Sequence, residues 1–216
     1  MKNPLKITLA ALALTATAGT LAGFSALETR TESTSTASAA ESAAQTYAVD
    51  TVHSGVFFKI RHNGVANFYG RLNDVQGTIE FDKDDIESAS MNFTVKTESV
   101  DTNNQKRDDH IRGADFFNAR QYPEATFTSS SVTKSGEGYE VTGELSLHGQ
   151  TQQVTAKLID IDTGTARGND VMGLEAHFEI SRTDFGITTY VNPEDPEEGS
   201  LGDKVKIIVS IEAGVK

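Results

Sequence analysis

The sequence predicts an all-β domain of about eight antiparallel strands, and three observations support this fold class. Apolar and polar residues alternate with a period of two over eight segments, as in strands with one buried and one wetted face. Turn signals rich in Gly and Asp separate these segments, as at 136–138 and 168–170. Only residues 103–119 interrupt the alternation. Eight meandering strands close into a barrel or split into a sandwich, and closure removes exposed strand edges.

Each predicted strand follows from its own alternation. The first two segments set Val, Phe and Ile against Lys, Arg, Thr and Glu, and the third alternates most regularly. The fourth is rich in Ser and Thr around Phe127, and the fifth and sixth meet at Gly149, which predicts a tight hairpin with a positive φ. The seventh and eighth set apolar residues against Glu and Lys. In chain order the segments are 56–60, 77–81, 89–96, 125–132, 139–147, 154–158, 172–180 and 204–212.

The interruption at 103–119 predicts a short helix. Charged residues dominate its first part, and the pair Phe116-Phe117 follows them. We expect this insertion to cap one end of the sheet, with the two rings packed into the end of the barrel as a plug.

The first 26 residues predict a cleaved export signal. Two lysines precede an apolar stretch rich in Ala and Leu, small residues follow, and cleavage fits after Ala26, with Ala39 as the alternative. Residues 27–46 lack apolar periodicity and predict a disordered tether of Ser, Thr, Ala and Glu. The folded domain is therefore expected over residues 47–216.

Composition excludes several classes of function. The chain of 216 residues has a formal net charge of −12, which argues against nucleic acid as a partner because neutralising phosphates requires a basic surface. The absence of cysteine excludes disulfides, thiolate metal sites, Cys nucleophiles and an acylated N-terminal cysteine, so the protein is not a lipoprotein. We predict no metal and no cofactor.

The interior of the predicted barrel can be filled or hollow, and the pattern leaves both open. A hollow interior walled by Val, Ile, Leu and Phe suits an apolar guest, since burying each CH₂ is worth about 0.8 kcal/mol. A filled interior favours an interaction or stress-response module whose acidic surface steers a basic partner. The third alternative is an enzyme acting on a lipid-like substrate, but no convergent base and nucleophile support it.

Six groups of motifs, in one order and at similar spacing, resemble those of the YceI family. They extend from about residue 47 to the C-terminus. The motifs are Asp50-x-x-His53-Ser54-x-Val56-x-Phe58-x-Ile60-x-His62; Gly77-Thr78-Ile79-Glu80-Phe81-Asp82; Ser99-Val100-Asp101-Thr102 with Arg107-Asp108-Asp109-His110-Ile111-Arg112 and Asp115-Phe116-Phe117-Asn118; Tyr122-Pro123-x-x-x-Phe127-x-Ser129; Gly143-x-Leu145-x-Leu147-x-Gly149; and Arg182-x-Asp184-Phe185-Gly186-Ile187.

The resemblance implies an antiparallel, eight-stranded, lipocalin-like barrel with a short helical insertion capping one end. It also implies an exported, periplasmic, non-enzymatic protein that holds a polyisoprenoid, such as an isoprenoid quinone, or another long-chain amphiphile. The ligand would partition into the barrel without any bond being made or broken. Transient membrane contact and dimer formation are left open.

The predicted ligand-contacting residues are the inward positions of the strands together with the aromatic pair of the insertion. They are Val56, Phe58, Ile60, His62, Ile79, Phe81, Met91, Phe93, Val95, Phe116, Phe117, Phe127, Val141, Leu145, Leu158, Leu174, Phe178, Phe185 and Val209.

Several polar residues near the predicted barrel ends invite two interpretations. His62 shares the inward parity of its strand, so it either contacts a ligand head group or is satisfied by nearby loop backbone. Arg182 and Asp184 flank the turn at 185–186 and are predicted to form an ion pair that fixes it. Leu72 stands where the family pattern has an aromatic residue, which predicts a smaller cavity wall at that point.

Three clusters that resemble chemical sites are interpreted as structural. Residues 108–110 are consecutive on the predicted helix, so Asp, Asp and His do not converge on a metal, and a solvated helix is expected. His53 and Ser54 are adjacent on a strand and point to opposite faces, so they form no nucleophile pair. The acidic loop at 192–199 is interpreted as a solubilising surface feature.

Overall fold

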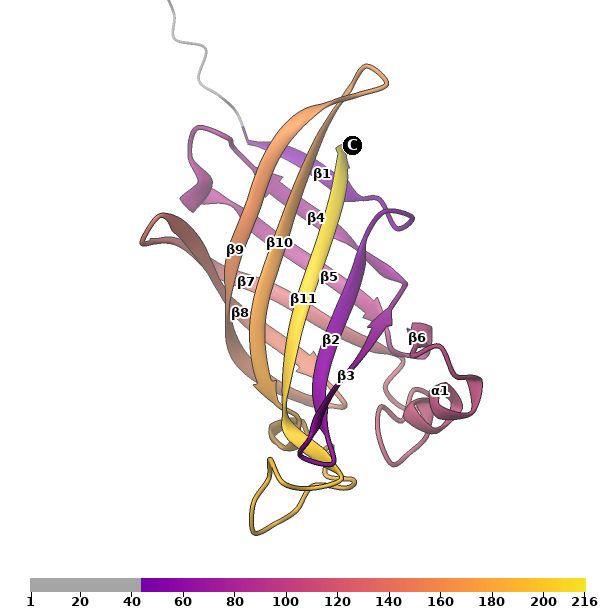
Figure 1. The fold of residues 1–216 in the computed structure, drawn as a ribbon. Helices are drawn as coiled ribbons and strands as arrows, with labels where there is room; N and C mark the ends of the chain where they lie inside the picture. Colours follow the sequence, from indigo (N-terminus) through magenta and orange to yellow (C-terminus); the bar gives the residue numbers. More distant parts are fainter. Residues whose placement is uncertain (1–43) are drawn as a thin grey trace, which may run out of the picture. The chain divides into compact units, whose positions relative to one another are not determined.

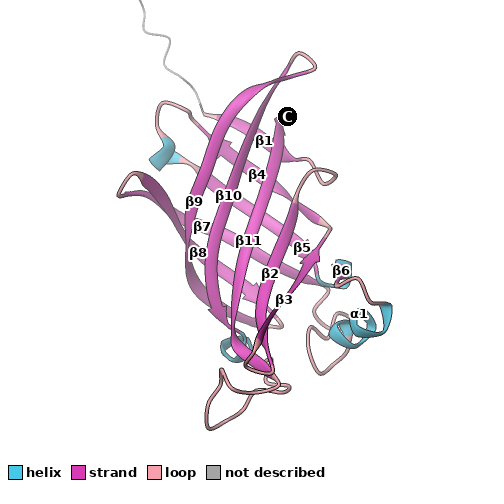
Figure 2. Cartoon of the chain, viewed as in Figure 1, coloured by secondary structure: helices cyan, strands magenta, loops and turns pink. Residues whose placement is uncertain are grey.

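The computed structural model describes residues 44–216, which form eleven strands, one α-helix and three short 3₁₀ helices (Figures 1 and 2). The predicted export signal and most of the predicted tether lie outside the described residues. The strands are β1 (Gln45–Val49), β2 (Gly55–His62), β3 (Ala66–Leu72), β4 (Val75–Phe81), β5 (Ser90–Lys96), β6 (Val100–Asp101), β7 (Glu124–Ser135), β8 (Gly138–Leu147), β9 (Gln150–Ala166), β10 (Asn169–Ser181) and β11 (Leu201–Val215). The helices are η1 (Ile86–Ser88), η2 (Thr97–Ser99), α1 (Gln105–Arg112) and η3 (Arg182–Phe185).

Eight of these strands close into an antiparallel barrel, which confirms the predicted fold class. Their order around the ring is β1-β4-β5-β7-β8-β9-β10-β11, and β1 closes the ring by pairing with both β4 and β11. β2, β3 and β6 continue the sheet from β11 (Figure 1). Closure leaves few unpaired strand edges in the ring.

The eight strands of the ring are not the eight that alternation picked out. β1 belongs to the ring but was predicted in part as tether, and β3 was not predicted at all. β1 has five residues, and β3 contains Gly70 and several polar residues, so neither has a strong apolar alternation of its own. Pairing with neighbouring strands stabilises both, which is a tertiary contribution that local pattern does not contain.

β11 changes partners along its length, and this change divides the barrel. Its first part pairs with β2, from Val205 opposite Ile60 to Ser210 opposite Gly55. Its last residues pair instead with β1, with Val215 opposite Tyr47. One half of the barrel is therefore closed by β1, and the other half is bordered by the β2–β3 hairpin.

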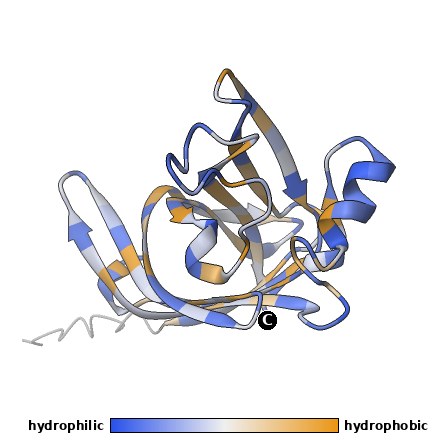
Figure 3. Ribbon diagram, turned by 90° about the horizontal axis from the view of Figure 1, so that it is seen from below, coloured by the Kyte–Doolittle hydropathy of each residue, from blue (hydrophilic) through white to orange (hydrophobic). Residues whose placement is uncertain are grey.

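The half closed by β1, which we call the packed end, has a solid apolar core. Residues there are almost completely buried, and the ring of Tyr47 packs edge-on against Phe81 with centroids 6.5 Å apart. Figure 3, seen from below the view of Figure 1, shows hydrophobic and hydrophilic positions alternating along the barrel strands. The core side chains of the packed end are Tyr47, Ile79, Phe81, Leu158, Met172, Leu174, Ile211 and Ala213.

The insertion forms α1 as expected, at the end of the barrel opposite the packed end (Figure 1). Asn104 caps the helix by accepting a hydrogen bond from the backbone N–H of Arg107 at 3.0 Å. The expectation of a fully solvated helix was wrong for Asp108, which is buried and accepts hydrogen bonds from both the N–H and the hydroxyl of Thr102. Neither α1 nor any other helix within residues 44–216 is long and apolar enough to cross a bilayer.

The predicted hairpin between β8 and β9 is confirmed. His148 has φ of 52° and Gly149 has φ of 77°, so both residues of the tight turn lie in the left-handed region that such hairpins require. Tyr122 packs closely over this turn, since a Cβ on Gly149 would lie 2.6 Å from the Tyr122 ring. A glycine is therefore needed there for its conformation and for its lack of a side chain.

Candidate ligand-binding cavity

The half of the barrel bordered by the β2–β3 hairpin encloses a cavity of about 730 Å³. This volume falls within the range of about 300–1,000 Å³ that is common for small-molecule sites. Most of the lining is apolar, from Val, Ile, Leu, Phe and Ala on the inward faces of the strands. The question that the pattern left open is thus answered: one half of the interior is packed and the other is hollow.

Fourteen of the nineteen predicted ligand-contacting residues line this cavity. Contact with a ligand remains a prediction for each of them. They are Val56, Phe58, Ile60, His62, Met91, Phe93, Val95, Phe116, Phe117, Phe127, Val141, Leu145, Phe178 and Val209.

The other five predicted residues lie outside the cavity lining and are buried. Ile79, Phe81, Leu158 and Leu174 belong to the core of the packed end. Phe185 is buried in η3, with 1% of its surface exposed. Strand alternation correctly predicted that these side chains lie inside the domain. Alternation alone does not show whether the interior around them is filled or hollow.

The cavity also has lining residues that were not predicted. Phe68 comes from β3, Ile111 from α1, and Ile187 from the segment after η3, whereas Leu72 on β3 lines the cavity at the point where the sequence predicted a wall position. The alternation of Ala66, Phe68, Gly70 and Leu72 was the available signal for β3, but small residues weaken it. Ile111 and Ile187 lie outside the strands, so strand alternation could not identify them.

The cavity stays open partly because aromatic rings lie over glycines instead of projecting into the lumen. A Cβ on Gly143 would lie 2.6 Å from Phe127 Cζ, and one on Gly70 would lie 2.8 Å from Phe58 Cε1. Both rings therefore occupy space that a side chain on the neighbouring strand would fill. This cross-strand arrangement covers the glycine backbone with an aromatic side chain and keeps the ring along the wall.

Polar lining residues gather at one end of the cavity, which we call the mouth. His62, Arg107, His110 and Tyr190 come from β2, α1 and the segment before β11. Phe116 lies among them, with its ring 5.1 Å from that of His110 and 6.2 Å from that of Tyr190. Phe116 thus lies at the mouth, while Phe117 also lines the cavity and packs against the buried core.

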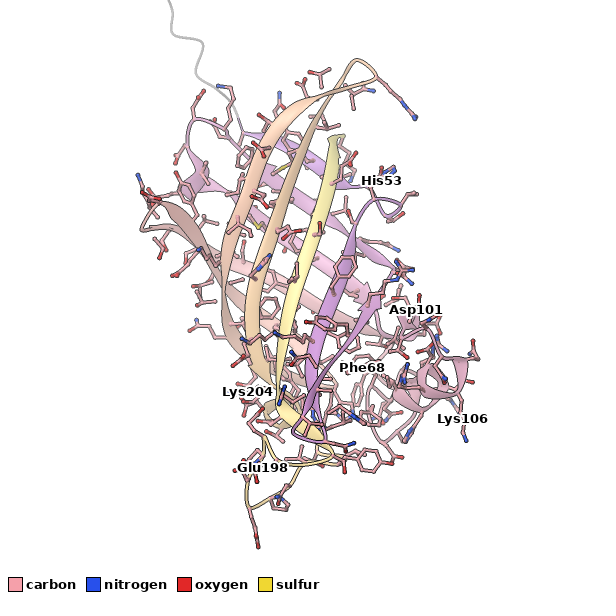
Figure 4. The ribbon with its side chains drawn as sticks, in the orientation of Figure 1. His53, Phe68, Asp101, Lys106, Glu198 and Lys204 are labelled. Atoms are coloured by element: carbon pink, nitrogen blue, oxygen red, sulfur yellow. The ribbon has the colours of Figure 1, made fainter. Side chains whose placement is uncertain are left out.

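Arg107 is held firmly at the mouth. Its Nε donates to Thr102 Oγ1 at 2.8 Å, and its Nη2 donates to the Thr102 carbonyl at 2.7 Å. Its guanidinium carbon lies 4.4 Å from the centre of the Phe68 ring, a cation–π distance. Figure 4 shows Phe68 on β3. It also shows Lys106, which precedes Arg107 in the chain, at the outer side of α1.

The predicted ion pair between Arg182 and Asp184 was wrong. The buried Arg182 guanidinium instead donates to four backbone carbonyls at 2.8–3.0 Å, those of Gly202, Ile187, Thr189 and Leu201. Burial lowers the pKa of Arg182. An arginine was the right residue to fix this turn, but its partners are carbonyls, which a sequence pattern does not reveal.

The Asp50, His53 and Ser54 motif forms a surface turn between β1 and β2. His53 Nδ1 lies 2.8 Å from Asp50 Oδ2, and this hydrogen bond raises the pKa of His53 and lowers that of Asp50. Ser54 Oγ donates to the Glu212 carbonyl and accepts from the Glu212 N–H, at 3.2 and 3.0 Å. Ser54 is therefore engaged by backbone, as expected for a structural residue.

Asp50, His53 and Glu212 also form the one group within residues 44–216 whose potential metal-ligating atoms lie within 4.8 Å of one another. These side chains are largely exposed, and none of them lines the cavity. The Asp50 side chain bonds to His53 and to the N–H of Val52. The backbone of Glu212 bonds to Asp50 and Ser54, so contacts within the turn account for this arrangement.

A closed antiparallel barrel around an apolar cavity, with polar groups at its mouth, is typical of the class of barrels that can hold one small apolar ligand. The YceI-like domain family matches residues 47–213. Protein YceI of Escherichia coli O17:K52:H18 is 39% identical over 178 residues, which cover 81% of this chain and 90% of that protein. The chain therefore belongs to the YceI family.

Solved structures agree with this family assignment. The Campylobacter jejuni YceI protein has a TM-score of 0.63 and 29% identity, covering 73% of this chain and 91% of its own. A polyisoprenoid-binding domain from Saccharophagus degradans, implicated in plant cell wall breakdown, has a TM-score of 0.57 and 14% identity, covering 79% of this chain and 98% of its own. The second likeness is one of fold.

Proposed function

We propose that the protein binds a polyisoprenoid or a similar long-chain amphiphile in the barrel cavity and carries or sequesters it in the periplasm without bond chemistry. The observation that carries this proposal is the apolar cavity of about 730 Å³, which opens at a polar mouth. The polyisoprenoid binding of the Saccharophagus degradans domain supports the choice of ligand class. The alternative of a filled interaction module required a packed interior throughout, which the barrel does not have.

Binding of this kind is equilibrium partitioning. Each CH₂ that leaves water contributes about 0.8 kcal/mol, so several isoprene units outweigh the cost of immobilising the ligand. No carboxylate lines the cavity among the described residues, and the two lining arginines, Arg107 and Arg182, already donate hydrogen bonds to protein oxygens. The polar head of the ligand then stays at the mouth, where side chains and water solvate it.

Export to the periplasm is part of this proposal. It rests on the N-terminal Lys-containing, Ala- and Leu-rich segment of the sequence. A periplasmic carrier would load and unload at a membrane, so transient contact of the mouth with the bilayer follows from the same proposal.

Native mass spectrometry of the protein purified from its own host tests the function. We expect a mass increment that matches a long-chain lipid found in the organic extract of the same sample. A bare polypeptide mass in repeated preparations, with no lipid in the extract, would contradict the proposal.

A matched pair of variants places the ligand. The double variant Ala156→Leu and Ala176→Leu adds bulk to two lining positions on β9 and β10 and should lose most of the bound lipid. Thr155→Leu adds an apolar side chain at an exposed position of β9 next to Ala156, and this variant should retain its bound lipid. Equal lipid content in the two proteins would show that the lipid lies elsewhere.

A further inference from the structure

The cavity lining has an unexpected charge distribution. The chain carries 31 acidic and 19 basic residues, yet none of the described residues that line the cavity is Asp or Glu. The charged or chargeable lining residues are Arg107, Arg182, His62 and His110. Although the protein is strongly acidic, its described cavity lining therefore contains no carboxylate.

Arg107 is the charged lining residue whose guanidinium has a nitrogen, Nη1, without a hydrogen-bond partner in the described part of the chain. All but one of the N–H groups of Arg182 are used on four carbonyls in the buried turn. Arg107 uses Nε and Nη2 on Thr102, and its Nη1 makes no hydrogen bond to any residue in the described part of the chain. An arginine always carries its charge, so these donors are available at any physiological pH.

A rigid support holds the Arg107 guanidinium in place. Thr102, which accepts from Arg107, is itself fixed by the buried carboxylate of Asp108, to which it donates its N–H at 2.8 Å. The Phe68 ring closes the other side of the guanidinium. Because the side chain is already ordered, a ligand that accepts from Nη1 loses less conformational entropy than it would with a free arginine.

The acidic groups near the mouth leave this donor free. Asp115 lies 3.2 Å from His110 Nε2, and the carboxylate of Asp108 is occupied by Thr102. Glu197 of the acidic loop accepts the N–H of Lys204 at 2.9 Å. None of these carboxylates forms an ion pair with Arg107.

We propose that Arg107 recognises the ligand head group, so that the cavity selects amphiphiles whose heads accept hydrogen bonds through oxygen, prefers anionic oxygen heads, and rejects cationic heads. This inference rests on the proposed function, since it concerns the head of the ligand whose chain fills the barrel. A head-group oxygen at the mouth receives a charge-assisted hydrogen bond from Nη1. An ammonium head would meet the guanidinium charge and find no carboxylate in the lining.

Three amphiphiles with one tail test the proposal: farnesyl phosphate, farnesol and farnesylamine. Each displaces an environment-sensitive apolar dye from the delipidated protein below its micelle concentration. We expect farnesyl phosphate to bind most tightly, farnesol next and farnesylamine most weakly. Farnesylamine binding as tightly as farnesyl phosphate would overturn the proposal without any variant being needed.

Arg107→Met and Lys106→Met form the matched pair of variants. Each removes one positive charge from α1, but Lys106 does not line the cavity. Arg107→Met should weaken farnesyl phosphate binding about tenfold to a hundredfold, the range for loss of a charge-assisted hydrogen bond, and should change farnesol binding much less. Lys106→Met should leave all three affinities nearly unchanged.

The outcomes separate the two proposals. If Arg107→Met weakens the binding of all three amphiphiles equally, Arg107 stabilises the structure of the mouth and does not recognise the head group. The head-group proposal then fails, while the proposed binding function of the cavity stands. The same holds if Lys106→Met reproduces the effect on farnesyl phosphate, because the effect is then one of net charge. If the wild-type protein binds neither the dye nor any of the amphiphiles, the proposed function itself fails.

Discussion

The two ends of the barrel share long strands such as β10 and β11, yet one end is packed and the other is hollow. On β10, Met172 and Leu174 lie in the packed core, whereas Phe178, on the same face, lines the cavity. On β11, Ile211 is packed and Ile207 lines the cavity. Period-two alternation therefore identifies the side chains that face inward, but the side chains across the lumen decide whether they meet in a packed core.

Two structural features create the difference. At the packed end, β1 closes the ring and brings Tyr47 against Phe81. At the hollow end, the β2–β3 hairpin borders β11 instead, and the rings of Phe58 and Phe127 lie over glycines along the wall. The strand that fills one end is absent from the other, and the aromatic side chains that could fill it are turned aside.

The largest effect that separates the two ends is the cost of removing an isoleucine. Ile79→Ala in the packed end should lower the free energy of unfolding by about 2–5 kcal/mol, because the fully buried side chain leaves a cavity in a tight core. Ile207→Ala should cost about half as much, since Ile207 already borders empty space. Urea unfolding of the delipidated variants gives both values. Equal costs would mean that the hollow end is packed in solution.

A smaller effect should follow from adding one carbon beneath an aromatic ring. Gly70→Ala places a Cβ 2.8 Å from Phe58 Cε1 and so forces the Phe58 ring off the wall and into the lumen, which should cost about 1–3 kcal/mol of stability and reduce the amount of lipid bound. Gly164→Ala, on β9, is the control, because a Cβ there meets no atom within 4 Å. Thermal unfolding and lipid extraction measure the two consequences. If Gly70→Ala behaved like Gly164→Ala, the position of the Phe58 ring would not be what keeps the lumen open.

The smallest expected effect lies outside both interiors, at the turn that joins β1 to β2. Hydrogen bonding to Asp50 raises the pKa of His53 above its usual 6.5, so the stabilisation from this pair is complete below about pH 6.5 and is lost as the pH rises through the raised value. The same bond lowers the pKa of Asp50 below 3.8, so the contribution also disappears when the pH falls through that lowered value.

His53→Gln should therefore reduce the melting temperature slightly near pH 6 and have less effect near pH 9. Because both side chains are exposed, the change should be small. Ligand affinity should not change at either pH, since neither residue lines the cavity. A pH-dependent change in lipid binding that vanished in His53→Gln would show that this turn communicates with the cavity.

The sequence predicted the strands that carry their own apolar alternation, and with them most of the cavity wall. Met91, Phe93 and Val95 on β5 are the clearest case, because three large apolar residues alternate without interruption. It failed for β3, where Gly70 and polar residues dilute the pattern, and for the partners of Arg182, which are backbone carbonyls. Backbone partners carry no side-chain identity, so no residue pattern can point to them.

By itself, the sequence determined the antiparallel β fold, the inward face of each strongly alternating strand and the tight hairpin at Gly149, because these depend on local pattern and local backbone geometry. Only the tertiary structure decided that β1 completes the ring, that one half of the lumen stays empty and that Arg107 is held at the mouth by Thr102 and Phe68. These features depend on contacts between residues distant in the chain, and such contacts exist only once the sheet has closed.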